Sequence, residues 1–195
     1  MAEKEMINKQ NIRTKYLNLR NNLSLSERKE KSRKIWDKLM AEPSYQKAQA
    51  VLVYMDYRSE VMTTGLVEEL FKKGEKRVFA PRVEGMDIHF YEVHSMEDFE
   101  SGYQGIREPK EDWEKLFTLQ MMSEMKGLVL VPGAVFDRQR GRMGYGKGFY
   151  DRFLAEYIGL NSVALAFSCQ IAKRVPVEEH DIRPDLIITE DEMIR

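Results

Sequence analysis

The chain of 195 residues contains a single cysteine, Cys169, which excludes the disulfide framework of a small secreted domain. It also lacks an excess of charge of either sign. The 31 Lys and Arg residues nearly balance 32 Asp and Glu residues, and the formal net charge is -1. This balance argues against a general nucleic-acid or membrane surface. The lone cysteine fits a reducing environment, so we expect a cytoplasmic protein.

Long apolar runs are missing as well. The longest, residues 127–136, is interrupted by Pro132 and is too short to span a bilayer. The first residues, Met1-Ala2-Glu3-Lys4-Glu5, are charged and contain no apolar signal region. We therefore expect neither a membrane nor a nucleic acid as a partner. The length suits one domain with a sizeable core.

Hydrophobic periodicity predicts two N-terminal helices, followed by alternating strands and helices. The first helix spans residues 5–22, with an apolar stripe at Ile12, Tyr16, Leu19 and Leu23. The second follows a capping box at residues 24–27 and runs to residue 40. Further helices are predicted at 63–73, closed by Gly74, and at 148–158; strands are predicted at 51–54, 78–80, 88–93, 128–131, 163–167 and 186–189.

This order predicts an α/β fold, an open, mostly parallel twisted sheet with helices on both faces in a single domain over residues 1–195. Pro81 is expected to end the strand at 78–80. Residues 95–125 are the least regular part, and their path stays open. Ligands of such sheets bind beyond the carboxyl ends of the strands. The loops at 55–60, 81–82, 132–148 and 168–184 should share that edge.

The most informative segment is a glycine-rich junction between the strand at 128–131 and the helix that follows. Four glycines occur in the eight positions 141–148, interleaved with Arg142 and Lys147. Glycines let the backbone approach a ligand closely, and free N–H groups at a helix start attract anions. The segment therefore predicts a phosphate-binding loop. The alternative is a surface loop with solvated charges, but the density of glycines, cations and aromatic residues favours phosphate.

The loop matches neither common phosphate-binding class. Residues 141–147 fit a P-loop, but Gly148 stands where Ser or Thr would hold magnesium. A dinucleotide fingerprint starting at Gly144 would need a small residue at the position of Phe149. A nearby carboxylate should replace the missing hydroxyl as a metal ligand, and Asp151 is the obvious one.

Further motifs accompany the glycine-rich segment. They are Pro132-Gly133-x-x-Phe136-Asp137, the run 142–151, the Lys-x-x-x-Arg element at 9–13, Glu60, 79–82, 105–109 and 175–181. Together they resemble the 5-formyltetrahydrofolate cyclo-ligase (methenyltetrahydrofolate synthetase) family over residues 9–190. The resemblance implies that ATP and magnesium close 5-formyltetrahydrofolate into 5,10-methenyltetrahydrofolate, with release of ADP and phosphate. A phosphorylated formyl group is the implied intermediate, because phosphate is a better leaving group than an amide oxygen.

The resemblance also implies residue roles. The ATP-binding residues would be Lys9, Gln10, Asn11, Ile12, Arg13, Arg142, Met143, Gly144, Tyr145, Gly146, Lys147, Gly148, Phe149 and Tyr150. Arg142 and Lys147 would be the catalytic cations, with Lys147 nearest the transferred group. Asp151 and Asp181 would hold Mg²⁺, for which two carboxylates suffice. Without the resemblance, the simplest interpretation of Lys9 and Arg13 is that they lie on a solvent-exposed helix face.

The implied substrate-binding residues are Met55, Glu60, Tyr145, Gly146, Lys147, Gly148 and Phe149. A carboxylate such as Glu60 can pair twice with the N–H edge of a pterin. Tyr103 or Gln104 is expected to close the pocket from the irregular segment. Arg82 could contact phosphate or the glutamate tail of the folate. For each aromatic residue the alternative is core packing.

Two other functions stay open at this point. A small-molecule kinase on the same architecture would need the same loop and metal but would release a stable phosphorylated product. A regulatory module would bind nucleotide or folate without turnover; Asp151 and Asp181 argue against it, because binding alone needs no metal poised for transfer. We expect a monomer acting on small molecules. The nucleotide preference beyond ATP and the polyglutamate preference stay undetermined.

Overall fold

The computed structural model describes residues 2–178 and 181–195, with side chains from Lys9 onward. Its helices are α1 (Ala2–Asn21), α2 (Leu25–Ala41), α3 (Pro43–Lys47), α4 (Thr64–Lys73), α5 (Leu119–Glu124) and α6 (Phe149–Glu156). Short 3₁₀ turns are η1 (Met96–Asp98), η2 (Tyr103–Gly105), η3 (Trp113–Lys115) and η4 (Ser168–Gln170). Within these ranges, no helix is both long enough and apolar enough to cross a membrane.

A 7-stranded sheet forms the centre of the molecule, in the order β12-β11-β9-β6-β1-β2-β3. Its strands are β1 (Ala50–Leu52), β2 (Arg77–Glu84), β3 (Asp87–Val93), β6 (Gly127–Val131), β9 (Asn161–Leu165), β11 (Leu186–Ile188) and β12 (Met193–Ile194). The inner pairs are parallel, and only the edge strands β3 and β12 pair antiparallel. The predicted α/β fold with a mostly parallel sheet is confirmed.

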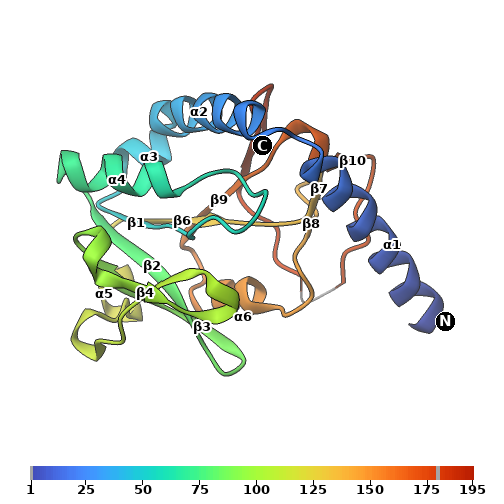
Figure 1. The fold of residues 1–195 in the computed structure, drawn as a ribbon. Coiled ribbons are helices and arrows are strands. Elements are labelled where there is room, and N and C mark those ends of the chain that lie inside the picture. Colours follow the sequence, from blue (N-terminus) through green and yellow to red (C-terminus); the bar gives the residue numbers. More distant parts are fainter. Residues whose placement is uncertain (1, 179–180) are drawn as a thin grey trace.

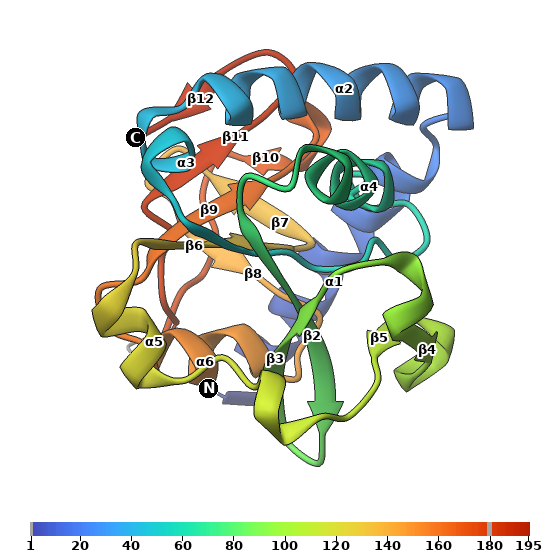
Figure 2. The same ribbon diagram turned by 90° about the vertical axis from the view of Figure 1, so that its left-hand side faces the viewer.

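Successive residues of the buried strands point to opposite faces of the sheet and join different cores. Val51 and Leu128 belong to one core, which α2 and α4 cover. Leu52 and Val129 belong to the other, which α5 and α6 cover. Figures 1 and 2 show this arrangement of helices on both faces of the sheet. The sequences of these buried strands are continuous apolar runs because both faces of the sheet are buried.

Local sequence signals set the helix ends where they were predicted. The Glu27 N–H donates to Ser24 Oγ at 3.2 Å, and the Ser24 N–H donates to Glu27 Oε2 at 2.8 Å. This reciprocal capping box begins α2. Gly74 ends α4 in the left-handed conformation, with φ of 60°.

Two details of the prediction are wrong. Strand β2 does not stop at Pro81 but continues to Glu84. Beyond Phe79 it pairs only with β3, and a strand that pairs on one side tolerates proline. Leu19 is not part of the buried stripe of α1, because it is 42% exposed. The buried side of that helix passes through Arg20 instead, which is 3% exposed.

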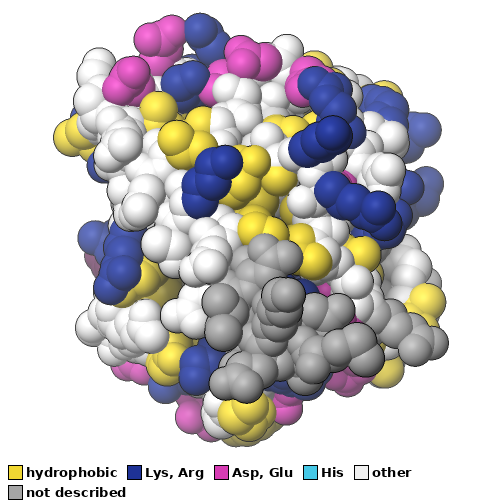
Figure 3. Space-filling model, turned by 90° about the vertical axis from the view of Figure 1, so that its right-hand side faces the viewer, with side chains coloured by type: hydrophobic (Ala, Val, Ile, Leu, Met, Phe, Trp, Pro, Cys, Tyr) yellow, Lys and Arg dark blue, Asp and Glu magenta, His cyan; other side chains and the backbone are white. Residues whose placement is uncertain are grey.

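Helix α1 lies beyond the carboxyl end of β6, against a small sheet of β10 (Ile171–Ala172), β7 (Val135–Asp137) and β8 (Arg142–Met143) (Figure 1). Ile12, Tyr16 and Leu17 pack there on a third apolar cluster that includes Val135 and Met143. On this face, hydrophobic side chains are bordered by Lys and Arg side chains (Figure 3). The small hairpin of β4 (Phe99–Ser101) and β5 (Arg107–Pro109) lies near β2 (Figure 2). Thus α1 and this hairpin flank the edge where ligands of such sheets bind.

Candidate active site

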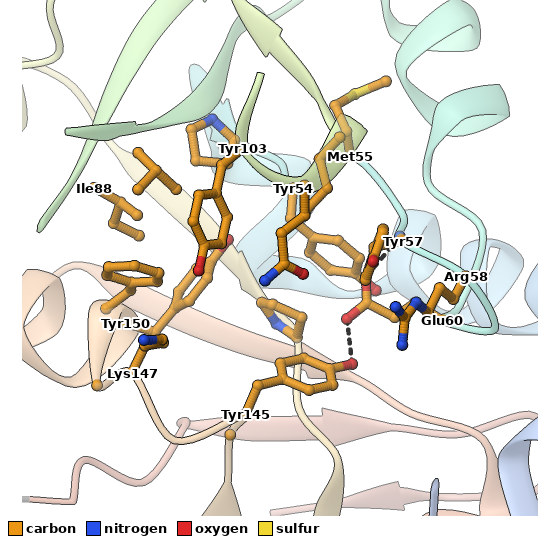
Figure 4. Close-up of a pocket in the computed structure, with 18 of the residues that line it drawn as sticks. Tyr54, Met55, Tyr57, Arg58, Glu60, Ile88, Tyr103, Tyr145, Lys147 and Tyr150 are labelled. Atoms are coloured by element: carbon orange, nitrogen blue, oxygen red, sulfur yellow. Dashed lines mark hydrogen bonds between the residues drawn. The ribbon is translucent and has the colours of Figure 1, made fainter. Parts of the chain in front are cut away.

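A cavity of about 320 Å³ opens at the carboxyl edge of the sheet. It lies between the loop after β1, the β2–β3 hairpin, the segment 103–108 and the glycine-rich loop at 141–148, which we call the glycine loop. Its size suits a small-molecule ligand. Figure 4 shows Glu60 and Arg58 on one side of the cavity, with Tyr103, Tyr150 and Lys147 on the other. The lining residues confirm the prediction for the loops at 55–60, 81–82 and 132–148, whereas no described residue of 168–184 lines the cavity.

The glycine loop contains β8, leads into α6 and requires glycine at two positions. Gly146 has φ of 95° and Gly148 has φ of 68°, values that residues with a side chain rarely adopt. Gly148 is also the residue that caps the start of α6, without a side-chain cap. Lys147 and Gly148 line the cavity. Within the described part of the chain, no carboxylate forms an ion pair with Lys147, so its charge is available to an anionic ligand.

Arg142 is held by an ion pair at the base of the cavity. Its Nη2 donates to Asp151 Oδ1 at 2.6 Å, and its side chain is 3% exposed. The Nε of the same guanidinium is buried without a hydrogen-bond partner among the described residues. A buried donor without a partner is costly unless a ligand satisfies it. This orphan donor, beside Lys147 in a glycine loop, fits an anion such as a phosphate oxygen.

A buried carboxylate lies on the opposite side of the cavity. Glu60 is 5% exposed, and its Oε2 accepts the Tyr57 N–H at 2.8 Å. Its Oε1 accepts a short hydrogen bond from the Tyr145 hydroxyl, which Figure 4 shows pointing at the carboxylate. Burial raises the pKa of Glu60, while the Tyr145 hydrogen bond and the charge of Arg20 oppose this rise.

Arg20 completes this arrangement from α1. Its Nη1 donates to the Tyr145 hydroxyl oxygen at 2.7 Å, and its Nε donates to Ser59 Oγ at 2.9 Å. The Tyr145 side chain is 43% exposed, but its hydroxyl end lies inside, between Arg20 and Glu60. Burial, and then the neighbouring charge of Glu60, raise the pKa of Tyr145, so its hydroxyl stays protonated and donates.

Of the two predicted cations of α1, Arg13 reaches the glycine loop and Lys9 does not. The Nε of Arg13 donates to the Gly144 carbonyl at 2.9 Å. Lys9 forms a short ion pair with Glu178 and lies 3.9 Å from Asp181. None of the five residues 9–13 lines the cavity, and Ile12 packs in the same apolar cluster as Met143. The structure therefore places Arg13 at the loop backbone and Lys9 beside Asp181.

One hydrogen bond links the surroundings of the two predicted metal ligands, Asp151 and Asp181. Asp151 Oδ1, which already accepts from Arg142, also accepts the Ile182 N–H at 3.1 Å. This bond brings the backbone next to Asp181 to the start of α6. Asp181 accepts the Glu178 N–H at 2.7 Å. Among the described residues, no group of three or more acidic, His or Cys side chains forms a metal cluster.

The irregular segment supplies one wall of the cavity. Tyr103, Gln104, Ile106 and Glu108 line it, and the Tyr103 ring meets Phe149 edge to face at 6.3 Å. Glu108, which sequence reasoning gave no role, is 5% exposed and accepts the Val83 N–H at 3.2 Å. Burial raises the pKa of Glu108. The segment is thus fixed to β2 by a buried carboxylate.

Arg82 supports the same wall rather than reaching the glycine loop. Its Nη1 donates to Glu100 Oε1 at 2.7 Å and to the Pro109 carbonyl at 2.8 Å. Both partners belong to the β4–β5 hairpin. Arg82 does not line the cavity. In this structure it braces the hairpin that carries Tyr103.

Sequence reasoning missed further cavity residues. They include Leu17, Arg20, Asn21, Tyr54, Tyr57, Arg58, Val83 and Ile88. Most lie on α1 or the β2–β3 hairpin, far in sequence from the glycine loop. For Arg20 a signal existed, since it follows Tyr16 by one helical turn and so falls on the apolar side of the helix.

Comparison with known proteins decides the family. The sequence model of the 5-formyltetrahydrofolate cyclo-ligase family matches residues 5–190. The chain belongs to this family. It is therefore a ligase of folate metabolism that acts on a small molecule, as the motifs indicated.

Individual members of the cyclo-ligase family agree. The chain is 29% identical to the 5-formyltetrahydrofolate cyclo-ligase of Mus musculus over 181 residues, 87% of both chains. It is 29% identical to that of Escherichia coli (strain K12) over 157 residues, 78% of this chain and 84% of the relative. The NMR structure of Aquifex aeolicus 5,10-methenyltetrahydrofolate synthetase matches with a TM-score of 0.83 and 36% identity, over 96% of this chain and 92% of that one.

Proposed function

We propose that this protein catalyses the ATP- and Mg²⁺-dependent cyclisation of 5-formyltetrahydrofolate to 5,10-methenyltetrahydrofolate, with release of ADP and phosphate. The observation that carries this proposal is the composition of one cavity. The glycine loop contributes Lys147 and the unpartnered Nε of Arg142, while the opposite side contributes the buried Glu60 among aromatic rings. A phosphoryl donor and a flat heterocyclic acceptor need these two environments side by side.

The chemistry explains why ATP is consumed. The formyl group on N5 is an amide, whose oxygen is a poor leaving group. In the proposed route that oxygen attacks the γ-phosphorus of ATP, an O–P bond forms, and the bond to ADP breaks. N10 then attacks the formyl carbon and loses its proton, and phosphate departs from that carbon to leave the methenyl ring. Phosphoryl transfer depends mainly on positioning and charge neutralisation, which cations such as Arg142 and Lys147 supply.

We assign the nucleotide to the glycine loop and the adjoining end of α1. The backbone of residues 142–150 would hold the phosphates, and Lys147 would be the cation nearest the transferred group. Arg13 supports this assignment through its hydrogen bond to the Gly144 carbonyl, which fixes the loop. Lys9, Gln10, Asn11 and Ile12 would adjoin the nucleotide from the same helix. Residues 1–195 would then be one domain around a shared ATP- and folate-binding cleft.

The residues present fit a magnesium ion bound mainly through phosphate and water. Magnesium commonly uses only one or two protein carboxylates, so the absence of a larger acidic cluster among the described residues is compatible with it. Asp151 and Asp181 would hold it, since the bond from the Ile182 N–H to Asp151 Oδ1 brings the backbone next to Asp181 to the Asp151 side chain. The ion would supply charge neutralisation to the transferring phosphoryl group.

The folate would occupy the other half of the cavity. Glu60 would pair with the N–H edge of the pterin, with Met55, Tyr145 and Phe149 around the ring. Tyr103 and Gln104 would close the cavity from the irregular segment, where Tyr103 already contacts Phe149. We also infer a cytoplasmic monomer; the single cysteine supports the first part.

The test is a spectroscopic assay of product formation. Purified protein is mixed with 5-formyltetrahydrofolate, and absorbance is followed at the methenyl band with ATP or magnesium added or withheld. We expect a rise only when both are present, together with release of ADP and phosphate. A stable phosphorylated product without the methenyl band would overturn the proposal in favour of a kinase. Binding of ATP with no turnover would overturn it in favour of a regulatory module.

A further inference from the structure

Arg20 carries a buried positive charge that has no role in the proposed reaction. The residue is 3% exposed, and its guanidinium donates to Ser59 Oγ, the Tyr145 hydroxyl and, at 3.4 Å, the Gly133 carbonyl. An arginine stays charged in a protein at any ordinary pH. In the part of the chain that the structure describes, no carboxylate forms a direct ion pair with it. A desolvated charge of this kind requires a countercharge nearby.

Arg20 reaches a countercharge through one hydroxyl. Tyr145 accepts a hydrogen bond from Arg20 and donates one to Glu60, so it bridges the guanidinium and the carboxylate. A tyrosine hydroxyl has a single proton. While its oxygen accepts from Arg20, that proton is directed at Glu60, and each hydrogen bond polarises the other. The three side chains act as an ion pair with a hydroxyl inserted between its members.

We propose that Arg20 is the positioning residue of the folate half of the cavity, acting through Tyr145 to fix the carboxylate of Glu60. This inference rests on the proposed function, in which Glu60 pairs with the pterin. Two independent bonds hold that carboxylate: the Tyr57 N–H on Oε2 and the Tyr145 hydroxyl on Oε1. The second comes from a side chain on a different segment, the glycine loop. Arg20 is the group that restrains it.

The charge of Arg20 also favours the ionised form of Glu60. Burial is the largest influence on this carboxyl and raises its pKa, and the negative charge of Asp56 adds to the rise. The Tyr145 hydroxyl, the positive charge of Arg20 and the Tyr57 N–H act in the opposite direction. The hydroxyls of Tyr54 and Tyr150 also lie within the electrostatic influence of Glu60, and burial keeps both protonated. Removing Arg20 should therefore raise the pKa of Glu60 further.

The experiment compares Arg20→Gln, Arg20→Lys and Tyr145→Phe with the wild-type chain. For Arg20→Gln we expect the KM for 5-formyltetrahydrofolate to rise about tenfold or more, the usual effect of losing a charged hydrogen bond. The KM for ATP should stay nearly unchanged. The acid limb of kcat/KM for the folate should move to higher pH. Arg20→Lys should restore part of both effects, because it keeps the charge but not the fork of donors.

Tyr145→Phe removes the bridge without removing the buried charge, so it tests the idea if Arg20→Gln fails to fold. It should also raise the folate KM and shift the acid limb upward. Arg33→Gln is the matched control, since that arginine is exposed on α2 and pairs with Glu69. Unchanged folate KM and acid limb in both Arg20→Gln and Tyr145→Phe would overturn the inference, as would equal rises in the KM values for folate and ATP. A wild-type protein that forms no methenyl product would instead overturn the proposed function itself.

Discussion

Replacing Asp151 by alanine should destabilise the fold, because it removes the countercharge of a buried arginine. The substitution leaves two donors without their acceptor: Arg142 Nη2, 2.6 Å from Asp151 Oδ1, and the Ile182 N–H, 3.1 Å from the same oxygen. Breaking a buried ion pair on one side costs about 3–5 kcal/mol. The Asp151 side chain is 17% exposed, which places the expected loss at the lower end, about 3 kcal/mol.

Thermal melting without nucleotide or magnesium measures this loss. For a chain of this size, 1 kcal/mol corresponds to about 2–4 °C, so Tm should fall by about 6–12 °C. Asp151→Asn keeps an acceptor oxygen and loses only the charge, so its Tm should lie between those of the wild-type protein and Asp151→Ala. Asp37→Asn, which alters an exposed pair with Arg33, should leave Tm almost unchanged. An Asp151→Ala protein that melts within about 2 °C of wild type would refute the reasoning.

The same variants separate the ion pair from the proposed metal role. If Asp151 also holds magnesium, Asp151→Asn should require a higher magnesium concentration for half-maximal turnover. A normal magnesium titration in a protein with lowered Tm would contradict the metal role and leave the ion pair intact. The two readouts are independent, because the melt contains no metal.

Three further predictions concern other parts of the molecule. Lys147→Ala should lower turnover by about 10²-fold with little change in formylfolate KM; an unchanged turnover number would contradict its role. Gly146→Ala should cost about 1–2 kcal/mol of stability through backbone strain at φ of 95°, since its Cβ would meet no atom closer than 3.7 Å; an unaltered melt would refute this. The hydrogen bond from Arg77 lowers the pKa of Glu92, so the pair stabilises the fold above pH 4.5 and this contribution is lost on acidification. Glu92→Gln should therefore lower Tm at neutral pH and not in acid, and a difference independent of pH would contradict the assignment.

The parts of the fold that could be predicted are those with local causes. The capping box at Ser24 and the left-handed Gly74 each depend on a few neighbouring residues, and the buried strands are apolar runs. Strands β7, β8 and β10 contain only 3, 2 and 2 residues, too few to show an alternating pattern. Residues 95–125 contain short 3₁₀ turns, three-residue strands and the six-residue helix α5, which was not predicted, and such short elements explain the irregular appearance of this part of the sequence.

The candidate site also has a part that could be predicted from the sequence and a part that could not. The glycine loop is contiguous, so its glycines, Arg142, Lys147 and Asp151 could be found from one stretch of sequence. Arg20 lies 125 positions from Tyr145. Its place one helical turn after Tyr16 puts it on the apolar side of α1, but its contact with Tyr145 depends on a distant loop, which no local pattern reports. The roles of the predicted site residues stay predictions until the variants are measured.

Helix α1 joins the two halves of the proposed site. A loop with four glycines in eight positions has many accessible conformations and needs external contacts to hold one. Arg13 holds the Gly144 carbonyl, and Arg20 holds the hydroxyl of Tyr145, the next residue. These arginines are seven positions apart on one helix, about 10 Å, so their contacts are set by a rigid spacing. The helix thereby fixes the loop that would bind phosphate relative to the carboxylate that would bind the pterin, and a phosphoryl transfer between the two ligands depends on that distance.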